Sequence, residues 1–70
     1  MYKEVLPSRL KSAREENKLS QYKVAELLKL KQPTIASYEK GRTEPDIETL
    51  VKLAVLYCHT VDYFLGLADD

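Results

Sequence analysis

Apolar residues recur every three or four positions along most of the chain, which is the spacing of one face of an α-helix. Five short segments show this spacing, and nowhere do apolar and polar residues alternate as they would in a strand. Most segments also carry residues typical of helix ends: Ser20, Asp46 and Thr60 at their starts, and Gly41 and Gly66 after their last turns. The sequence therefore predicts an all-α fold.

The predicted helices cover residues 7–17, 21–28, 32–40, 47–57 and 61–65, with Pro7 in the first turn of the first helix. The residues expected to face the core are Leu6, Leu10, Ala13, Leu19, Val24, Ala25, Leu28, Leu30, Ile35, Tyr38, Ile47, Leu50, Leu53, Ala54 and Tyr57. A chain of 70 residues buries only about 60% of the surface that its unfolded form exposes. We therefore expect residues 1–70 to form one domain of modest stability.

The composition excludes several kinds of protein. The single cysteine excludes an internal disulfide and a zinc site of the usual several-cysteine kind. No apolar run approaches the 18 residues of a membrane helix, and the chain does not start like a signal peptide. We expect a cytoplasmic protein with no membrane partner.

The charges are divided unevenly although the net charge is zero. Residues 1–43 carry ten Lys and Arg against five Asp and Glu, whereas residues 44–70 carry one Lys against six acids. This asymmetry is compatible with a polyanionic partner, and equally with ordinary scatter of solvated charges.

Two of the predicted helices, 21–28 and 32–40, are separated by a three-residue turn, which is the helix-turn-helix arrangement. Any small helical protein contains neighbouring helices, so this spacing is only suggestive. The residues go further: the run from Leu19 to Gly66 resembles the lambda-repressor-like helix-turn-helix family, also called the Cro/cI or Xre family. The motifs that carry the resemblance are Leu19-Ser20-Gln21, Ile35, Tyr38-Glu39, Gly41, Pro45, Leu53-Ala54 and Asp62-Tyr63. With the first helix included, the resemblance covers about nine-tenths of the chain and implies a compact five-helix bundle.

The resemblance implies that helix 32–40 lies in the major groove of DNA, with its N-terminal residues on base edges. The base-reading positions would be Lys31, Gln32, Pro33 and Ser37. The phosphate-binding positions would be Gln21, Tyr22 and Lys23 on the preceding helix, and Lys40, Gly41 and Arg42 in a basic loop. The polar helix would thus read bases while the basic loop fixes the register.

Two further features follow from the resemblance. Arg14 and Glu39 match a buried ion pair of the family, the alternative being two independent surface charges. Surplus apolar residues near the C-terminus suggest a homodimer interface where relatives dimerise, the alternative being the edge of the core. They are Val51, Val55, Phe64, Leu65 and Leu67.

The chain departs from the family pattern at two turns. Lys29 stands where the family has a turn glycine, so we expect a lysine in the left-handed conformation, and Lys31 replaces the usual Ser or Thr cap. Cys58 and His59 replace glycine and valine before the last helix. We interpret them as a buried or half-buried structural pair, because no base, acid or third ligand accompanies them for catalysis or metal binding.

The sequence therefore favours a sequence-specific regulator of transcription, of the phage, plasmid or bacterial repressor type, that binds a pseudo-palindromic double-stranded DNA operator as a homodimer. The alternative is an adaptor or antitoxin-type module that keeps the fold, binds DNA weakly or not at all, and has a protein partner such as a toxin. Neither hypothesis involves an enzyme activity, a cofactor or a metal.

Overall fold

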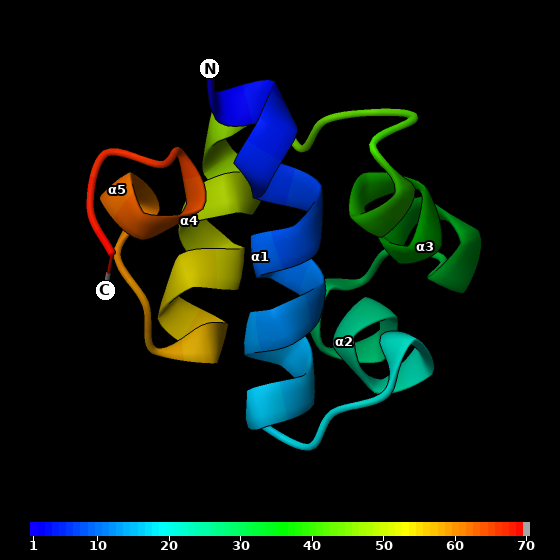
Figure 1. The fold of residues 1–70 in the computed structure, drawn as a ribbon. Helices are drawn as coiled ribbons and strands as arrows, with labels where there is room; N and C mark the ends of the chain where they lie inside the picture. Colours follow the sequence, from blue (N-terminus) through cyan, green and yellow to red (C-terminus); the bar gives the residue numbers. More distant parts are fainter. Residues whose placement is uncertain (70) are drawn as a thin grey trace.

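The computed structural model describes residues 1–69, and within them the chain forms five helices and no strand (Figure 1). The helices are α1 (Tyr2–Glu16), α2 (Gln21–Leu28), α3 (Gln32–Lys40), α4 (Ile47–Tyr57) and α5 (Val61–Phe64). The predicted all-α fold is confirmed, and the bounds of α2, α3 and α4 agree with those read from the sequence.

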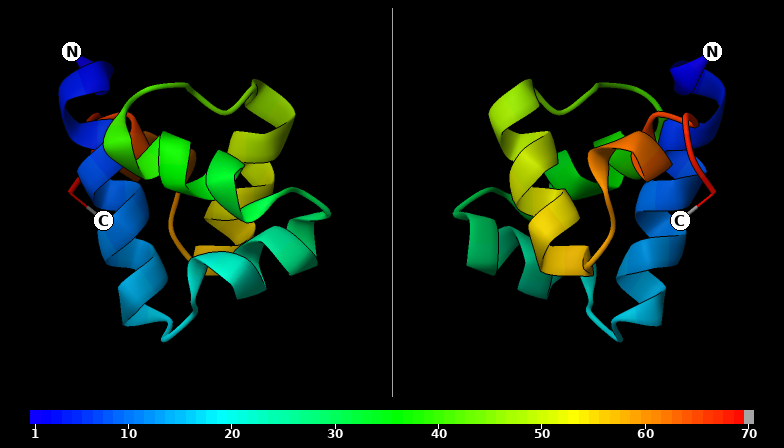
Figure 2. Two further views of the ribbon diagram at one scale, coloured as in Figure 1. Left: turned by 90° about the vertical axis from the view of Figure 1, so that its right-hand side faces the viewer. Right: turned by 90° about the vertical axis from the view of Figure 1, so that its left-hand side faces the viewer.

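The first helix lies in the middle of the fold. Figure 1 shows α2 and α3 on one side of α1, and α4 and α5 on the other. Helix α1 contacts α3 and α5, α2 contacts α3, and α4 contacts α5. In the left view of Figure 2, α2 and α3 face the viewer with no other helix in front of them. The helix-turn-helix is therefore on the surface, supported from behind by α1.

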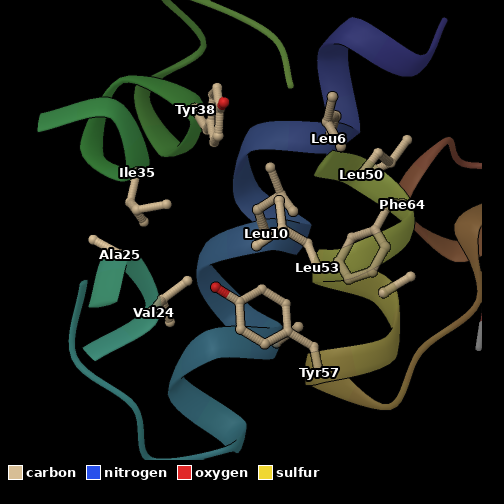
Figure 3. Close-up of a cluster of buried hydrophobic side chains, with 12 residues drawn as sticks. Leu6, Leu10, Val24, Ala25, Ile35, Tyr38, Leu50, Leu53, Tyr57 and Phe64 are labelled. Carbon is tan, nitrogen blue, oxygen red and sulfur yellow. The ribbon is translucent and has the colours of Figure 1, made fainter. Parts of the chain in front are cut away.

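The core is a cluster of apolar side chains contributed by every helix (Figure 3). In that view Leu10 of α1 lies between Ile35 of α3 and the pair Leu53 and Phe64. The buried residues are Leu6, Leu10, Ala13, Val24, Ala25, Ile35, Tyr38, Leu50, Leu53, Ala54, Tyr57 and Phe64. Leu19, Leu28 and Leu30 pack against this cluster as partly buried residues. Burial raises the pKa of Tyr57 and of Tyr38, because a phenolate would lose its hydration there.

One predicted core residue is on the surface: Ile47 is 83% exposed. It lies four residues before Val51 and eight before Val55, both of which are also exposed. Residues four apart share one face of a helix, so these three form a stripe beside the core-facing side of α4. The prediction for Ile47 was wrong because its hydrophobicity does not reveal which face of the helix it occupies.

Helix α1 begins at Tyr2, five residues before the predicted start at Pro7. Proline cannot donate its backbone nitrogen to the preceding turn, yet the helix continues through it. Contacts from distant parts of the chain hold this extra turn: the Tyr2 hydroxyl donates to Glu44 at 3.0 Å, and Leu6 is buried. The last helix ends at Phe64, one residue earlier than predicted, and Gly66 follows in the left-handed conformation with φ +79°.

The helix caps follow the sequence closely. The side-chain oxygens of Ser20, Asp46 and Thr60 accept hydrogen bonds from backbone N–H groups at 3.0, 2.8 and 3.0 Å. Each bond satisfies one of the donors that a helix N-terminus leaves unpaired. Lys29 is left-handed with φ 58°, as expected, and so is Cys58 with φ 60°. These conformations cost a non-glycine residue about 1–2 kcal/mol each.

The Cys58-His59 turn is only partly as predicted. His59 is half-buried: its ring stacks on Tyr63 with 4.1 Å between centroids, and its Nε2 lies 2.9 Å from Glu16 Oε1. Cys58 is exposed instead, because it ends α4 and its left-handed backbone turns it away from the core. On the other side of the same tyrosine, the guanidinium of Arg9 lies 4.7 Å from the ring centre. This cluster fastens the turn before α5 to α1.

Candidate nucleic-acid interface

The turn between α2 and α3 sets the angle of the two helices. Lys29 takes the left-handed conformation, after which the Leu30 backbone N–H donates to the Ala25 carbonyl at 2.8 Å. The Leu30 side chain packs against the core, whereas Lys29 and Lys31 are exposed. The turn therefore presents two lysines beside the first residue of α3. Lys31 makes no side-chain cap, in keeping with the absence of the usual Ser or Thr at that position.

The four predicted base-reading residues lie at or near the start of α3. Lys31 and Pro33 are exposed, and Gln32 and Ser37 are half-buried. Ser37 is tied to the loop after α3, because its hydroxyl accepts a hydrogen bond from Thr43 at 2.9 Å. Its carbonyl also accepts from the Arg42 backbone N–H at 3.0 Å. These bonds fix the loop relative to the helix.

The basic loop leaves its polar groups accessible. Lys40, Gly41 and Arg42 are all exposed, and Gly41 ends α3 with φ +75°. A Cβ on Gly41 would lie 3.2 Å from Pro7 Cγ, so glycine serves both the left-handed turn and the close approach to α1. Arg42 also lines a cavity of about 490 Å³ together with Lys3 of α1. No sequence pattern predicted that Lys3 would lie beside this loop.

The predicted ion pair between Arg14 and Glu39 is present and largely buried. Arg14 Nε donates to Glu39 Oε2 at 2.7 Å, and Arg14 Nη2 donates to Glu39 Oε1 at 3.1 Å. The side chains are 12% and 4% exposed, so the alternative of two independent surface charges is wrong. The hydrogen bond to Glu39 raises the pKa of Arg14, against the opposing effect of burial. The pair joins α1 to α3.

Two glutamines extend this pair to the surface. Gln21 Nε2 donates to Glu39 Oε1 at 3.0 Å, and Gln32 Nε2 donates to Gln21 Oε1 at 2.8 Å. The first residue of α2 is thereby linked to the first residue of α3 and to the buried ion pair. Both glutamines were predicted at the interface, but their mutual hydrogen bond was not, because residues 21 and 32 have no regular helical spacing to reveal it.

The rest of the first turn of α2 is open to solvent. Tyr22 is 72% exposed, and the Lys23 ammonium lies 2.9 Å from Glu26 in a surface ion pair. The start of α2 also carries backbone N–H groups and a partial positive charge that favour an anion. The side chain of Gln21 points to Glu39 and Gln32, so its backbone N–H is the more available group for a phosphate.

The predicted dimer residues have different environments. Val51, Val55 and Leu67 are 45%, 74% and 74% exposed, and Leu65 is half-buried. Phe64 is fully buried, with ring centroids 5.0 Å from Tyr63 and 6.3 Å from Tyr57. Its assignment to a dimer interface was therefore wrong, since it belongs to the core of the monomer.

Chemistry of other kinds has no visible support in residues 1–69. No group of three or more His, Cys, Asp or Glu side chains in this part of the chain could hold a metal ion. The same residues contain no helix with the length and apolar character needed to cross a membrane.

Comparison with known proteins identifies the architecture. A family model described as Helix-turn-helix matches residues 10–57, which include α2, the turn, α3 and α4. The chain belongs to this helix-turn-helix family. The resemblance to the Cro/cI-type helix-turn-helix, first seen in the motifs from Leu19 onward, is thereby confirmed.

Three proteins of Bacillus subtilis (strain 168) are similar to this helix-turn-helix domain. The HTH-type transcriptional regulator ImmR is 39% identical over 61 residues, which are 87% of this chain and 48% of that protein. The uncharacterized HTH-type transcriptional regulator YobD is 39% identical over 89% of this chain and 55% of its own length. For the uncharacterized HTH-type transcriptional regulator YqaE the values are 36%, 80% and 48%. The chain thus spans about half the length of these relatives.

Proposed function

We propose that this domain binds double-stranded DNA sequence-specifically as the DNA-binding part of a transcriptional regulator, with α3 in the major groove. The observation that carries the proposal is the position of Gln32. Its amide lies at the exposed start of α3, is held by Gln21, and stands one helix length from the basic loop 40–42. The names of the three relatives, all HTH-type transcriptional regulators, support the same function.

Base recognition would come from the first residues of α3. A glutamine amide can bond adenine bidentately, accepting from N6 and donating to N7, and a lysine can donate to the O6 or N7 of guanine. Gln32 retains a free N–H and its carbonyl oxygen after donating to Gln21, so both groups that adenine requires remain available. Lys31 is exposed beside it, and Pro33 and Ser37 complete the proposed reading surface.

Phosphate contacts would flank this surface on both sides. Lys40, Gly41 and Arg42 follow α3, and an arginine can fork onto two phosphate oxygens. Gln21, Tyr22 and Lys23 start α2, where backbone N–H groups favour an anion. Such contacts fix the orientation of the protein on the duplex without specifying sequence. DNA as the partner also implies a cytoplasmic location in a bacterial cell.

A homodimer would let two α3 helices read the halves of a pseudo-palindromic operator about 34 Å apart. The exposed apolar residues Val51, Val55 and Leu67, with Leu65 at their edge, are the proposed interface. Action as a repressor, by covering a promoter, is the simplest regulatory role for such a domain.

A second candidate function is an adaptor or antitoxin-type module with a protein partner such as a toxin. The zero net charge favours it, because a polyanion attracts such a protein weakly at long range. The exposed stripe of Ile47, Val51 and Val55 on α4 offers an apolar surface for a protein partner. Binding to DNA distinguishes the two candidates.

The test is a salt titration of binding to a random-sequence duplex. We expect log affinity to fall linearly with log salt, and Arg42→Ala to reduce the slope by about one for each phosphate that the arginine neutralises. Lys52→Ala is the matched control, since Lys52 is exposed on α4 and pairs with Glu48. Absence of binding by the parent protein at low salt would favour the protein-binding candidate. Equal slopes for the parent and Arg42→Ala would remove the basic loop from the interface.

A further inference from the structure

We propose that the buried Glu39 carboxylate sets the direction in which Gln32 presents its amide to a base. This inference rests on the proposed DNA-binding function. Glu39 is too deeply buried to touch DNA itself, with a side chain only 4% exposed. It would act through Gln21 as a positioning residue, and the ion pair with Arg14 would then serve specificity as well as the fold.

The first step is the hydrogen-bonding character of the carboxylate. An ionised carboxylate only accepts hydrogen bonds. Glu39 Oε2 accepts from Arg14 Nε at 2.7 Å, while Oε1 accepts from both Arg14 Nη2 at 3.1 Å and Gln21 Nε2 at 3.0 Å. A glutamine amide has one donating and one accepting end, so Gln21 has to turn its NH₂ group toward Glu39.

The second step passes this direction to the surface. With its NH₂ group on Glu39, Gln21 directs its carbonyl oxygen at Gln32, and Gln32 Nε2 donates to it at 2.8 Å. If Gln32 flipped its amide, two carbonyl oxygens would face each other and the hydrogen bond would be lost. The carboxylate therefore fixes the orientation of an amide two links away.

The third step concerns the base. Across the major-groove edge of adenine, N7 accepts and N6 donates in a fixed order. An amide held in one orientation matches this order for one orientation of an A·T pair and mismatches the reversed pair. A freely flipping amide would match either. The relay from Glu39 through Gln21 to Gln32 thus predicts discrimination between A·T and T·A at the position that Gln32 contacts.

The experiment compares two duplexes that differ only by reversal of that base pair, in the best site selected by the parent protein from random DNA. We expect the parent to prefer one orientation by roughly 5- to 150-fold, the range for a good bidentate contact. The first variant is Arg14→Met with Glu39→Met, because apolar residues of similar size often replace a buried ion pair without loss of stability. It keeps both glutamines but removes the carboxylate, so the preference should fall towards one.

A third substitution in this background provides the rescue. Gln21→Glu places an acceptor-only group directly beside Gln32, so Gln32 must again turn its NH₂ group inward and the preference should return. The added charge lowers affinity for every duplex alike, which leaves the ratio of the two affinities as the readout. Gln21→Met in the same background is the matched control and should not restore the preference. A merely structural role for the ion pair predicts no rescue by either substitution.

A separate variant covers failure of the double substitution to fold. Gln21→Met in the otherwise native chain cuts the relay and leaves the bonds between Arg14 and Glu39 in place. We expect it to melt near the parent and to lose the orientation preference. Retention of the full preference by a folded Gln21→Met or Arg14→Met/Glu39→Met protein would overturn the relay. Failure of the parent to select any sequence would instead overturn the proposed function, so the two failures are distinguishable.

Discussion

Replacing Glu39 by alanine should destabilise the domain by about 3 kcal/mol, because the Arg14 guanidinium would lose its counter-ion inside the protein. Truncation removes the acceptor of two Arg14 hydrogen bonds, at 2.7 and 3.1 Å, and of the bond from Gln21 at 3.0 Å. Arg14 would keep only its third bond, from Nη1 to the Leu19 carbonyl at 2.8 Å. The variant therefore tests how much of the fold depends on one carboxylate.

The magnitude follows from the burial of the two partners. Breaking a buried ion pair by removing one partner costs roughly 3–5 kcal/mol. The lower end applies here, because Arg14 keeps 12% exposure and its bond to Leu19. A chain of 70 residues has a total stability of roughly 3.5–10 kcal/mol at about 0.05–0.15 kcal/mol per residue. Loss of about 3 kcal/mol would therefore remove a third or more of it.

Urea unfolding followed by circular dichroism at neutral pH measures this loss. The control is Arg14→Met with Glu39→Met, which removes both charges and should unfold close to the parent midpoint. A loss below about 0.5 kcal/mol for Glu39→Ala would refute the reasoning, since that is the range of exposed ion pairs. An equal loss in the control would attribute the effect to packing instead of charge.

Three further predictions concern other parts of the molecule. Val55→Glu should leave the melting of the monomer nearly unchanged, because Val55 is 74% exposed, but should weaken operator binding and shift sedimentation toward the monomer. Hydrogen bonds from Thr49 lower the pKa of Asp46, so its contribution to stability is complete above the ordinary pKa of about 4 and is lost as pH falls through the lower, folded value; Asp46→Asn keeps the capping oxygen and should make acid melts less steep. Lys29→Gly should raise stability by about 1 kcal/mol in urea, because glycine adopts φ 58° without the cost that lysine incurs.

Each of these has a clear contrary result. A parent protein that sediments as a monomer with and without DNA would remove the interface at Val55. Identical acid melts for the parent and Asp46→Asn would mean that the cap does not titrate with folding. A lower midpoint for Lys29→Gly would show that the flexibility added to the unfolded chain outweighs the relieved backbone.

The helix ends were predictable because their chemistry is local. Ser20, Asp46 and Thr60 cap helices with their own side chains, and Gly41 ends α3, so the residues that determine these boundaries are adjacent to them in sequence. The start of α1 was not, because Pro7 is typical of a first turn and the true first turn is held by Tyr2 on Glu44, 42 residues away. Local signals cannot reveal a contact of that kind.

The faces of short helices were also beyond the sequence. Phe64 belongs to a helix of only four residues, too short to show a period, so its hydrophobicity was compatible with both the core and an interface. Ile47 begins α4, where the preceding loop has no periodic pattern to orient it. Hydrophobicity predicts that a residue seeks burial, but only the packing of neighbouring helices decides where.

The candidate site divides in the same way. The family motif predicted the ion pair of Arg14 and Glu39, and the structure confirmed it. The link from Glu39 through Gln21 to Gln32 joins α3 back to the starts of α2 and α3, and its residues have no common spacing. Hydrogen bonds between side chains of different helices depend on rotamers, which sequence patterns do not specify.

The most direct test of DNA reading by α3 is the binding of the parent and of Gln32→Ala to a site selected from random DNA and to a scrambled duplex. We predict that Gln32→Ala loses about 1–3 kcal/mol on the selected site and almost nothing on the scrambled duplex, because a base contact adds only to specific binding. Equal losses on both duplexes, or no sequence enriched by the parent, would contradict DNA reading by α3.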